Sequence, residues 1–256
     1  MLPRVVPRSP GIRPDTPRGL LHFSRLHPVR ARRPQGACSE PERRIEVVPA
    51  DLVHLVRHGE VQNPDGVLYG RLPGYGLSER GHRMAEAAAA SLAGRPLVAL
   101  VASPLQRTRE SAQPWSERYG LEIRIDDRLI EPTNRFEGTR VREEVRRPRN
   151  WPALLAPWRP SWGEPYASIV RRMRAALDDA ADSVERGEVV LVSHQLPIWM
   201  VVRSVAGRPL PHSPLSRRCA LSSVTTFRRE RGVWREAGYS EPAAILLAGA
   251  VDEGAA

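Results

Sequence analysis

Two histidines stand at positions where enzymes built on a parallel sheet place their chemistry. His58 comes just after the apolar run at 52–56 (LVHLV), and His194 comes just after the run at 188–193 (EVVLVS). Both runs have the length and composition of buried strands. Ligands of open parallel sheets bind at the carboxyl ends of the strands, so both imidazoles are candidates for a functional site.

A zinc site is one interpretation of these histidines, because His54 lies four residues before His58. Four residues of a strand span roughly 13 Å, whereas a tetrahedral zinc ion holds each nitrogen at about 2.0–2.1 Å. The sequence also contains no HExxH motif and no cysteine cluster. We therefore expect no metal, and we interpret His54 as a packed strand residue.

An arginine marks the same edge of the predicted sheet. The stretch from Ser103 to Gln106 (SPLQ) has the form of a capping box, which predicts a helix that begins at Ser103 and has Arg107 in its first turn. The helix dipole disfavours a cation at that end. An arginine there therefore indicates a bound anion, which the guanidinium and the free backbone N–H groups would attract together.

Four short motifs occur in a characteristic order: LVRHGE at 55–60, SPLQRTRES at 103–111, LIEP at 129–132 and VSH at 192–194. Together they resemble the histidine phosphatase superfamily, in its phosphoglycerate-mutase-like branch, over about residues 52–230. The resemblance implies that His58 accepts a phosphoryl group, that Arg57 and Arg107 clamp the phosphate, and that His194 is the second histidine of the pocket.

The resemblance also implies a proton donor. Glu131 matches the acid of this branch, and Gln195 stands where the acid-phosphatase branch has an Asp directly after the second histidine. Asn63 and Arg71 are further candidates for substrate binding. Ordinary turn residues are the alternative interpretation of both, since Asn63 lies one residue short of the family's usual offset.

The physical chemistry agrees with these roles. A neutral imidazole can attack a phosphomonoester dianion in line only if fixed positive charge cancels the repulsion. Arg57, Arg107 and His194 are expected to supply that charge, and Glu131 is expected to protonate the leaving alkoxide and then to activate water. We therefore expect a phosphatase that acts on a small phosphorylated metabolite and needs no cofactor or metal. A phosphoglycerate-type mutase and a catalytically silent phospholigand-binding module stay open as alternatives.

The elements that must position these residues alternate between strand and helix. This order predicts an α/β fold of the phosphoglycerate-mutase type, a three-layer α/β/α sandwich around a mainly parallel sheet. Strands are expected at 52–56, 97–102, 122–125, 128–130 and 188–193, and two edge strands within 219–238. Helices are expected at 79–93 with Ser78 as the N-cap, from 103 onward, at 166–186 and at 196–205.

The chain divides into three parts by composition. Residues 1–46 are rich in Pro and Arg and are expected to be disordered; a transit peptide and a mis-set start codon are the alternatives. Residues 47–240 form the catalytic domain, with a variable insertion at 132–165, and residues 241–256 form a tail. Polar and aromatic side chains make the insertion a candidate lid, although packing onto the core explains its tryptophans equally well. They are Asn134, Arg135, Arg140, Trp151, Trp158 and Trp162.

Composition excludes several other classes of protein. The net charge is +10, but all 39 basic residues are arginine and eight of them fall in residues 1–39, which argues against a nucleic-acid groove. The apolar stretches fall short of the ~20 residues that span a bilayer. The two cysteines have no paired spacing, which favours a reducing cytoplasm. The sequence leaves a homodimer open.

Overall fold

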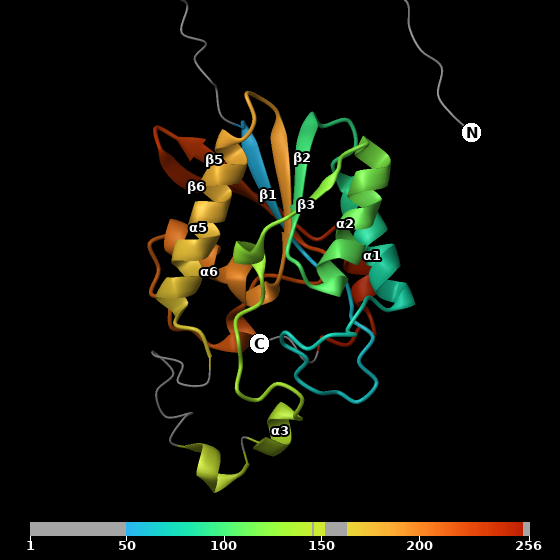
Figure 1. Cartoon of the computed structure of the whole chain (residues 1–256), viewed down its shortest axis with the longest axis vertical. Helices are drawn as coiled ribbons and strands as arrows, with labels where there is room; N and C mark the ends of the chain where they lie inside the picture. The colour runs from blue at the N-terminus through green and yellow to red at the C-terminus, as the bar shows by residue number, and fades with distance from the viewer. Residues whose placement is uncertain (1–49, 145, 152–162, 253–256) are drawn as a thin grey trace, which may run out of the picture. The chain divides into compact units, whose positions relative to one another are not determined.

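The computed structural model describes residues 50–144, 146–151 and 163–252 (Figure 1). Contacts divide the chain into residues 1–44 and residues 45–256, and all described residues lie in the second unit. The expected disorder of residues 1–46 and the side chains of Trp158 and Trp162 lie outside the described residues. Within the described residues, no helix combines the length and the hydropathy that a membrane span requires.

A six-stranded sheet forms the centre of this unit, with the strand order β3-β2-β4-β1-β5-β6. Strands β3, β2, β4 and β1 run parallel to one another, and β5 and β6 are antiparallel. The mainly parallel sheet is therefore confirmed. The strands are β1 (Leu52–Arg57), β2 (Leu97–Ala102), β3 (Ile123–Ile125), β4 (Glu188–Ser193), β5 (Val224–Glu230) and β6 (Val233–Ser240).

Helices cover both faces of the sheet. On one face lie α1 (Glu79–Ser91) and α2 (Gln106–Tyr119), and on the other lie α5 (Tyr166–Asp182) and α6 (Gln195–Val205) (Figure 1). The predicted three-layer sandwich is confirmed. Shorter helical segments are α3 (Val141–Glu144) and the 3₁₀ turns Asp127–Leu129, Pro148–Asn150, Pro214–Ser216 and Ala244–Leu247.

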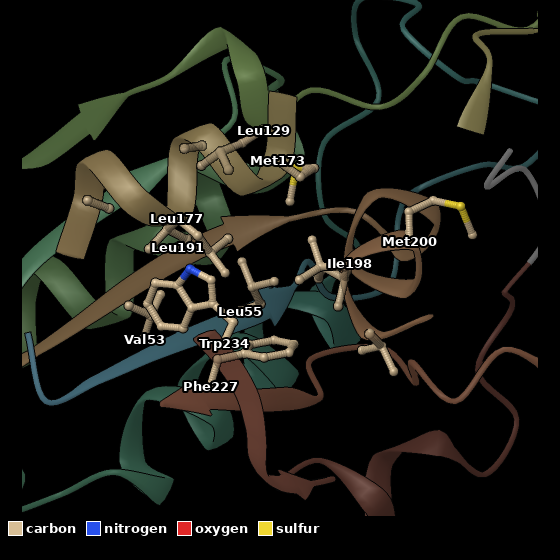
Figure 2. Close-up of a cluster of buried hydrophobic side chains, with 14 of the residues drawn as sticks. Val53, Leu55, Leu129, Met173, Leu177, Leu191, Ile198, Met200, Phe227 and Trp234 are labelled. Atoms are coloured by element: carbon tan, nitrogen blue, oxygen red, sulfur yellow. The ribbon is translucent and has the colours of Figure 1, made fainter. Parts of the chain in front are cut away.

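The core lies on both sides of the central strands because their side chains alternate between the two faces. Val53 and Leu55 of β1 pack toward α5 and α6, in a cluster that also contains Trp234 of β6 (Figure 2). Val56 of β1 packs on the opposite face, in the cluster that contains Trp115 of α2. Every residue of β1 and β4 is buried, as expected for central strands of a parallel sheet.

The predicted capping box is wrong. Helix α2 begins at Gln106 with Leu105 as its N-cap and no side-chain cap, three residues later than expected. The Ser103 hydroxyl is hydrogen-bonded instead to His194 Nε2, at 2.8 Å. A contact with a residue far along the chain has therefore replaced the local helix cap, although Arg107 still lies in the first turn of α2.

Two expected strand segments are turns. Residues 128–130 were expected to be extended, but Asp127–Leu129 is a 3₁₀ turn in which the Asp126 side chain accepts from the Arg128 N–H. The edge strand expected from residue 219 begins only at Val224, because Ser222 adopts a positive φ of 55° that breaks an extended backbone. Both differences come from backbone geometry that hydrophobic alternation does not report.

Candidate active site

His58 and His194 lie side by side at the carboxyl edge of the sheet. Strands β1 and β4 pair in register, with Arg57 opposite Ser193, so the histidine that follows each strand emerges next to the other. The ring centroids are 5.3 Å apart, and neither side chain is exposed to solvent. Register therefore brings together two residues that are far apart in the sequence.

The loop after β1 is fixed by its contact with the start of α1. A Cβ atom on Gly59 would collide with the Gly81 carbonyl, and a Cβ atom on Gly81 would collide with the Glu60 carbonyl. Ser78 caps α1, as predicted, by accepting from the Gly81 N–H, and its hydroxyl donates to the Glu60 carboxylate at 2.5 Å. The close backbone contact explains why the loop needs glycine next to His58.

The hydrogen bonds of His58 favour one neutral tautomer. Nδ1 lies 2.8 Å from the Gly59 carbonyl oxygen, which can only accept, so the proton is on Nδ1 and the lone pair is on Nε2. Nε2 is buried and has no hydrogen-bond partner among the described residues. Burial, followed by the positive charges of Arg107 and Arg57, lowers the pKa of His58 well below its ordinary value. The neutral ring therefore has a lone pair on Nε2 that no described residue engages.

Arg57 and Arg107 both act electrostatically on His58, and both guanidinium groups are buried. Arg57 donates through Nη1 to the Cys219 carbonyl oxygen at 2.7 Å, and Arg107 donates through Nη2 to the Gly70 carbonyl oxygen at 2.8 Å. The Arg107 guanidinium also lies 4.7 Å from the centre of the Tyr69 ring. These contacts fix the positions of both guanidinium groups.

His194 is held by two partners. Its Nδ1 lies 3.2 Å from Arg107 Nη2, which can only donate, so the neutral ring carries its proton on Nε2 and donates to Ser103 Oγ at 2.8 Å. Burial and then the Arg107 charge lower the pKa of His194 well below its ordinary value. Burial and the neighbouring Arg107 therefore both disfavour the protonated form of His194.

Glu131 places a carboxyl group in the same pocket. It is 1% exposed, and neither oxygen has a hydrogen-bond partner among the described residues, although Oε2 lies 3.4 Å from His194 Nδ1. Burial raises the pKa of Glu131 to about 7, against the charges of Arg107 and Arg217, which lower it. Near neutral pH this group is divided between its acid and its carboxylate form, which suits a group that gives up and takes back a proton.

The two weaker substrate-binding candidates have different positions. Asn63 exchanges two hydrogen bonds with Val67, with Nδ2 donating to its carbonyl oxygen at 2.9 Å and Oδ1 accepting from its N–H at 3.2 Å. Arg71 donates through Nε to the Glu131 carbonyl oxygen at 2.5 Å. The structure thus gives Asn63 a loop-closing contact and places Arg71 beside the predicted proton donor.

Helix α3, in the described part of the insertion, lies beyond the carboxyl edge of the sheet (Figure 1). Arg140 Nε donates to the Asp65 carbonyl oxygen at 3.0 Å, and Asn134 forms an isolated bridge with Gly163. Arg135 lies over the Phe136 ring, and Trp151 is 53% exposed. The Arg140–Asp65 hydrogen bond connects the described part of the insertion to the loop that carries Asn63.

Several residues of the site were missed from the sequence. Ser103 directly follows strand β2 at the carboxyl edge, so its position could have indicated a role in the site. The Tyr69 ring and the Cys219 carbonyl carry no recognisable sequence signal. Asp252, whose carboxylate pairs with Arg57, lies in a stretch that was interpreted as a tail.

His54 is a packed strand residue, as interpreted from the sequence. Its Nδ1 lies 2.9 Å from Thr226 Oγ1 and its Nε2 lies 2.9 Å from Glu188 Oε2. Over the part of the chain that the structure describes, no three His, Cys, Asp or Glu side chains are grouped as metal ligands.

Several known proteins are similar to this chain in sequence and in fold. Residues 53–241 match the profile of the histidine phosphatase superfamily (branch 1). The uncharacterised protein Rv0525 of Mycobacterium tuberculosis is 48% identical over 196 residues, which cover 75% of this chain and 97% of that protein. The probable phosphoglycerate mutase GpmB of Yersinia enterocolitica is 28% identical over 194 residues, covering 73% and 89%. The solved mycobacterial glucosyl-3-phosphoglycerate phosphatase Rv2419c is 26% identical, with a TM-score of 0.61 over 73% of this chain and 97% of that one.

Proposed function

Because the chain belongs to the histidine phosphatase superfamily, we propose that it hydrolyses phosphomonoesters through a phosphohistidine on His58. One observation carries this proposal: His58 Nε2 is a buried, unprotonated nitrogen without a hydrogen-bond partner among the described residues. The buried guanidinium groups of Arg107 and Arg57 both act on it electrostatically. A nitrogen in this state has its lone pair available for attack on an electrophile, and the surrounding charge selects an anionic one.

Binding of the phosphoryl group is assigned to Arg57, Arg107 and His194. Each arginine keeps an Nε–H that no described residue accepts, so both have donors left for phosphate oxygens. A bound dianion would also raise the pKa of His194, since it would replace a repulsive field with an attractive one. His194 could then gain the positive charge that it lacks in the unliganded site.

In the first chemical step, His58 Nε2 attacks phosphorus in line with the ester oxygen. The N–P bond forms as the P–O bond breaks, and the leaving alkoxide takes the proton of the Glu131 carboxylic acid. In the second step, the Glu131 carboxylate removes a proton from water, and the water oxygen attacks the phosphohistidine. Inorganic phosphate leaves, and Nε2 regains its lone pair while Glu131 is again protonated.

We propose further that no metal ion takes part, because the arginines can supply the charge that a metal would otherwise provide. The substrate is proposed to be a small phosphorylated metabolite, whose leaving group would meet the insertion after Glu131. Arg71 supports this assignment, since it contacts the Glu131 backbone and is 33% exposed at the side-chain level.

A mutase is the second candidate, and the similarity to the probable phosphoglycerate mutase GpmB favours keeping it. A mutase would return the phosphoryl group from His58 to a second hydroxyl of the substrate instead of to water. Screening phosphorylated metabolites for inorganic phosphate and, in parallel, for positional isomers separates the two. Isomers without phosphate release would replace the hydrolase with the mutase, and the absence of any turnover would favour a binding module.

The phosphohistidine is tested by trapping. Wild-type protein is mixed with ³²P-labelled substrate, quenched without acid, and separated from small molecules. Label should remain on the wild type and on the control variant His82→Ala, which removes an exposed histidine of α1, and it should be absent from His58→Ala. Label that persists in His58→Ala would refute the proposal.

A further inference from the structure

Residues 241–252, named here the 241–252 segment, pack against the start of the domain. Ala243 is buried in a small cluster with Met84 of α1 and Leu221, and Leu246 and Leu247 pack against that cluster. The Val251 N–H donates to Glu60 Oε1 at 2.8 Å. These contacts lead the segment along α1 to the loop that carries His58.

At the end of this segment, Asp252 binds the guanidinium of Arg57. Oδ2 accepts from Nη1 at 2.9 Å, and Oδ1 accepts from Nη2, so both carboxylate oxygens are engaged. The Arg57 side chain is completely buried, whereas that of Asp252 is 40% exposed. Although burial disfavours its charge, the Asp252 carboxylate raises the pKa of Arg57 above its ordinary value.

The same Nη1 and Nη2 atoms are the donors with which an arginine binds phosphate in a two-pronged manner. A carboxylate offers two coplanar oxygens and a negative charge to the paired Nη1 and Nη2 donors of a guanidinium. Asp252 and a phosphoryl group are therefore alternative ligands of Arg57. A dianion placed next to an ionised Asp252 would also be repelled by it.

We propose that Asp252 is an intramolecular competitor for the phosphate-binding site: its carboxylate occupies the Arg57 fork in the unliganded enzyme and leaves when a phosphoryl group binds. This inference rests on the proposed function, since it assumes that Arg57 binds phosphate. The exposed side of Asp252 gives it a way out, because the carboxylate can turn into water while Arg57 stays buried.

The charge of Asp252 is tested with Asp252→Asn, which keeps the size of the side chain. Calorimetric titration with inorganic phosphate, and KM for p-nitrophenyl phosphate, need no knowledge of the natural substrate. The Kd for phosphate and the KM for p-nitrophenyl phosphate should each fall by about 5- to 30-fold, while kcat changes little. This is the size expected for the loss of one charge-assisted pair with a half-exposed partner. Asp51→Asn removes an exposed carboxylate before β1, at the opposite edge of the sheet, and should leave both constants unchanged.

The direction of the change distinguishes the alternatives. If Asp252 instead orients Arg57 for the substrate, Asp252→Asn will weaken phosphate binding and raise KM, which would overturn the proposal, as would unchanged constants. Binding of phosphate to neither protein would refute the proposed phosphoryl site itself. The two failures are therefore distinguishable.

Hydrogen exchange gives a second measurement that does not depend on turnover. Saturating vanadate, a mimic of the phosphoryl group, should accelerate amide exchange across the 241–252 segment, most directly at Val251. In Asp252→Asn exchange should already be fast without vanadate. Protection of the segment by vanadate would show that it closes over the ligand, and the competitor proposal would have to be abandoned.

Discussion

Glu131 Oε2 and His194 Nδ1 lie 3.4 Å apart in a pocket where both side chains are buried. That separation is typical of an ion pair, but burial acts on both groups in the opposite sense, raising the pKa of the carboxyl to about 7 and depressing the pKa of the imidazole. The unliganded pair is therefore largely uncharged at mildly acidic pH. A phosphoryl dianion that arrives between Arg57 and Arg107 would meet an acid that still holds its proton.

The first prediction concerns leaving groups. An alkoxide needs a proton as it departs, whereas p-nitrophenolate is stable without one. Glu131→Gln should therefore slow phosphorylation of His58 by alkyl phosphates about 10²–10⁴-fold and by p-nitrophenyl phosphate much less. Single-turnover kinetics measure both. Glu86→Gln is the control, because Glu86 is an exposed residue of α1. Equal slowing of both substrates would make Glu131 a positioning residue.

The second prediction concerns stability and its pH dependence. The folded-state pKa of Glu131, about 7, lies above the ordinary value of 4.5, so the folded protein binds the proton more tightly than the unfolded chain does. This contribution to stability is complete below pH 4.5 and is lost as the pH rises through 7. The amide side chain that Glu131→Gln introduces does not titrate. The free energy of unfolding of this variant should therefore exceed that of the wild type by roughly 2–3 kcal/mol at pH 8.

Urea unfolding at pH 5 and at pH 8 measures this difference. The increase in unfolding free energy that Glu131→Gln produces should be smaller at pH 5 than at pH 8. Glu185→Gln, which removes an exposed carboxylate, is the control for the change in net charge. An equal effect of Glu131→Gln at the two pH values would mean that the folded protein does not hold this proton.

The third prediction concerns Ser103, which accepts from His194 Nε2. Ser103→Ala leaves that N–H without its partner in a buried site, and the ring can then adopt the other tautomer. We expect kcat to fall about 5- to 100-fold, with the melting temperature little changed. Thr225→Val, which removes a buried hydroxyl near the start of β5, should retain turnover. Similar losses in both variants would indicate a general packing defect.

The fourth prediction concerns metals. Since arginines are proposed to carry the charge, turnover should survive exhaustive chelation, and vanadate, which adopts the five-coordinate geometry of the transition state, should inhibit. Colorimetric phosphate release before and after chelation measures this. Activity that is lost and then restored by a divalent ion would contradict the arginine-only mechanism.

The central strands could be predicted accurately because they are buried on both faces. Strands β2 and β4 have the bounds expected from the sequence, 97–102 and 188–193. The apolar residues of β1 and β4 end shortly before His58 and His194. Their sequence alone therefore assigns both histidines to one edge of the sheet. A short, largely apolar run was sufficient there because burial on both faces, the property that such a run reports, is also what determines these strands.

Elsewhere, tertiary contacts decide what local signals cannot. The start of α2 was missed because Ser103 is bonded to His194, 91 residues away, instead of capping the helix. The pairing of Asp252 with Arg57 joins residues 195 positions apart, and no periodicity or motif reports it. The neutral state of His194 also depends on burial and on the nearby Arg107, and both follow only from the folded arrangement.

The position of β1 in the sheet also has a consequence for biosynthesis. This strand is the first of the described strands to leave the ribosome, yet its neighbours are β4 and β5, which follow roughly 130 residues or more later. At about 5–20 residues per second, β1 waits on the order of ten seconds with both edges unpaired and its apolar side chains uncovered. Among the described strands, the one that precedes the proposed nucleophile therefore stays unpaired longest and most needs protection from aggregation.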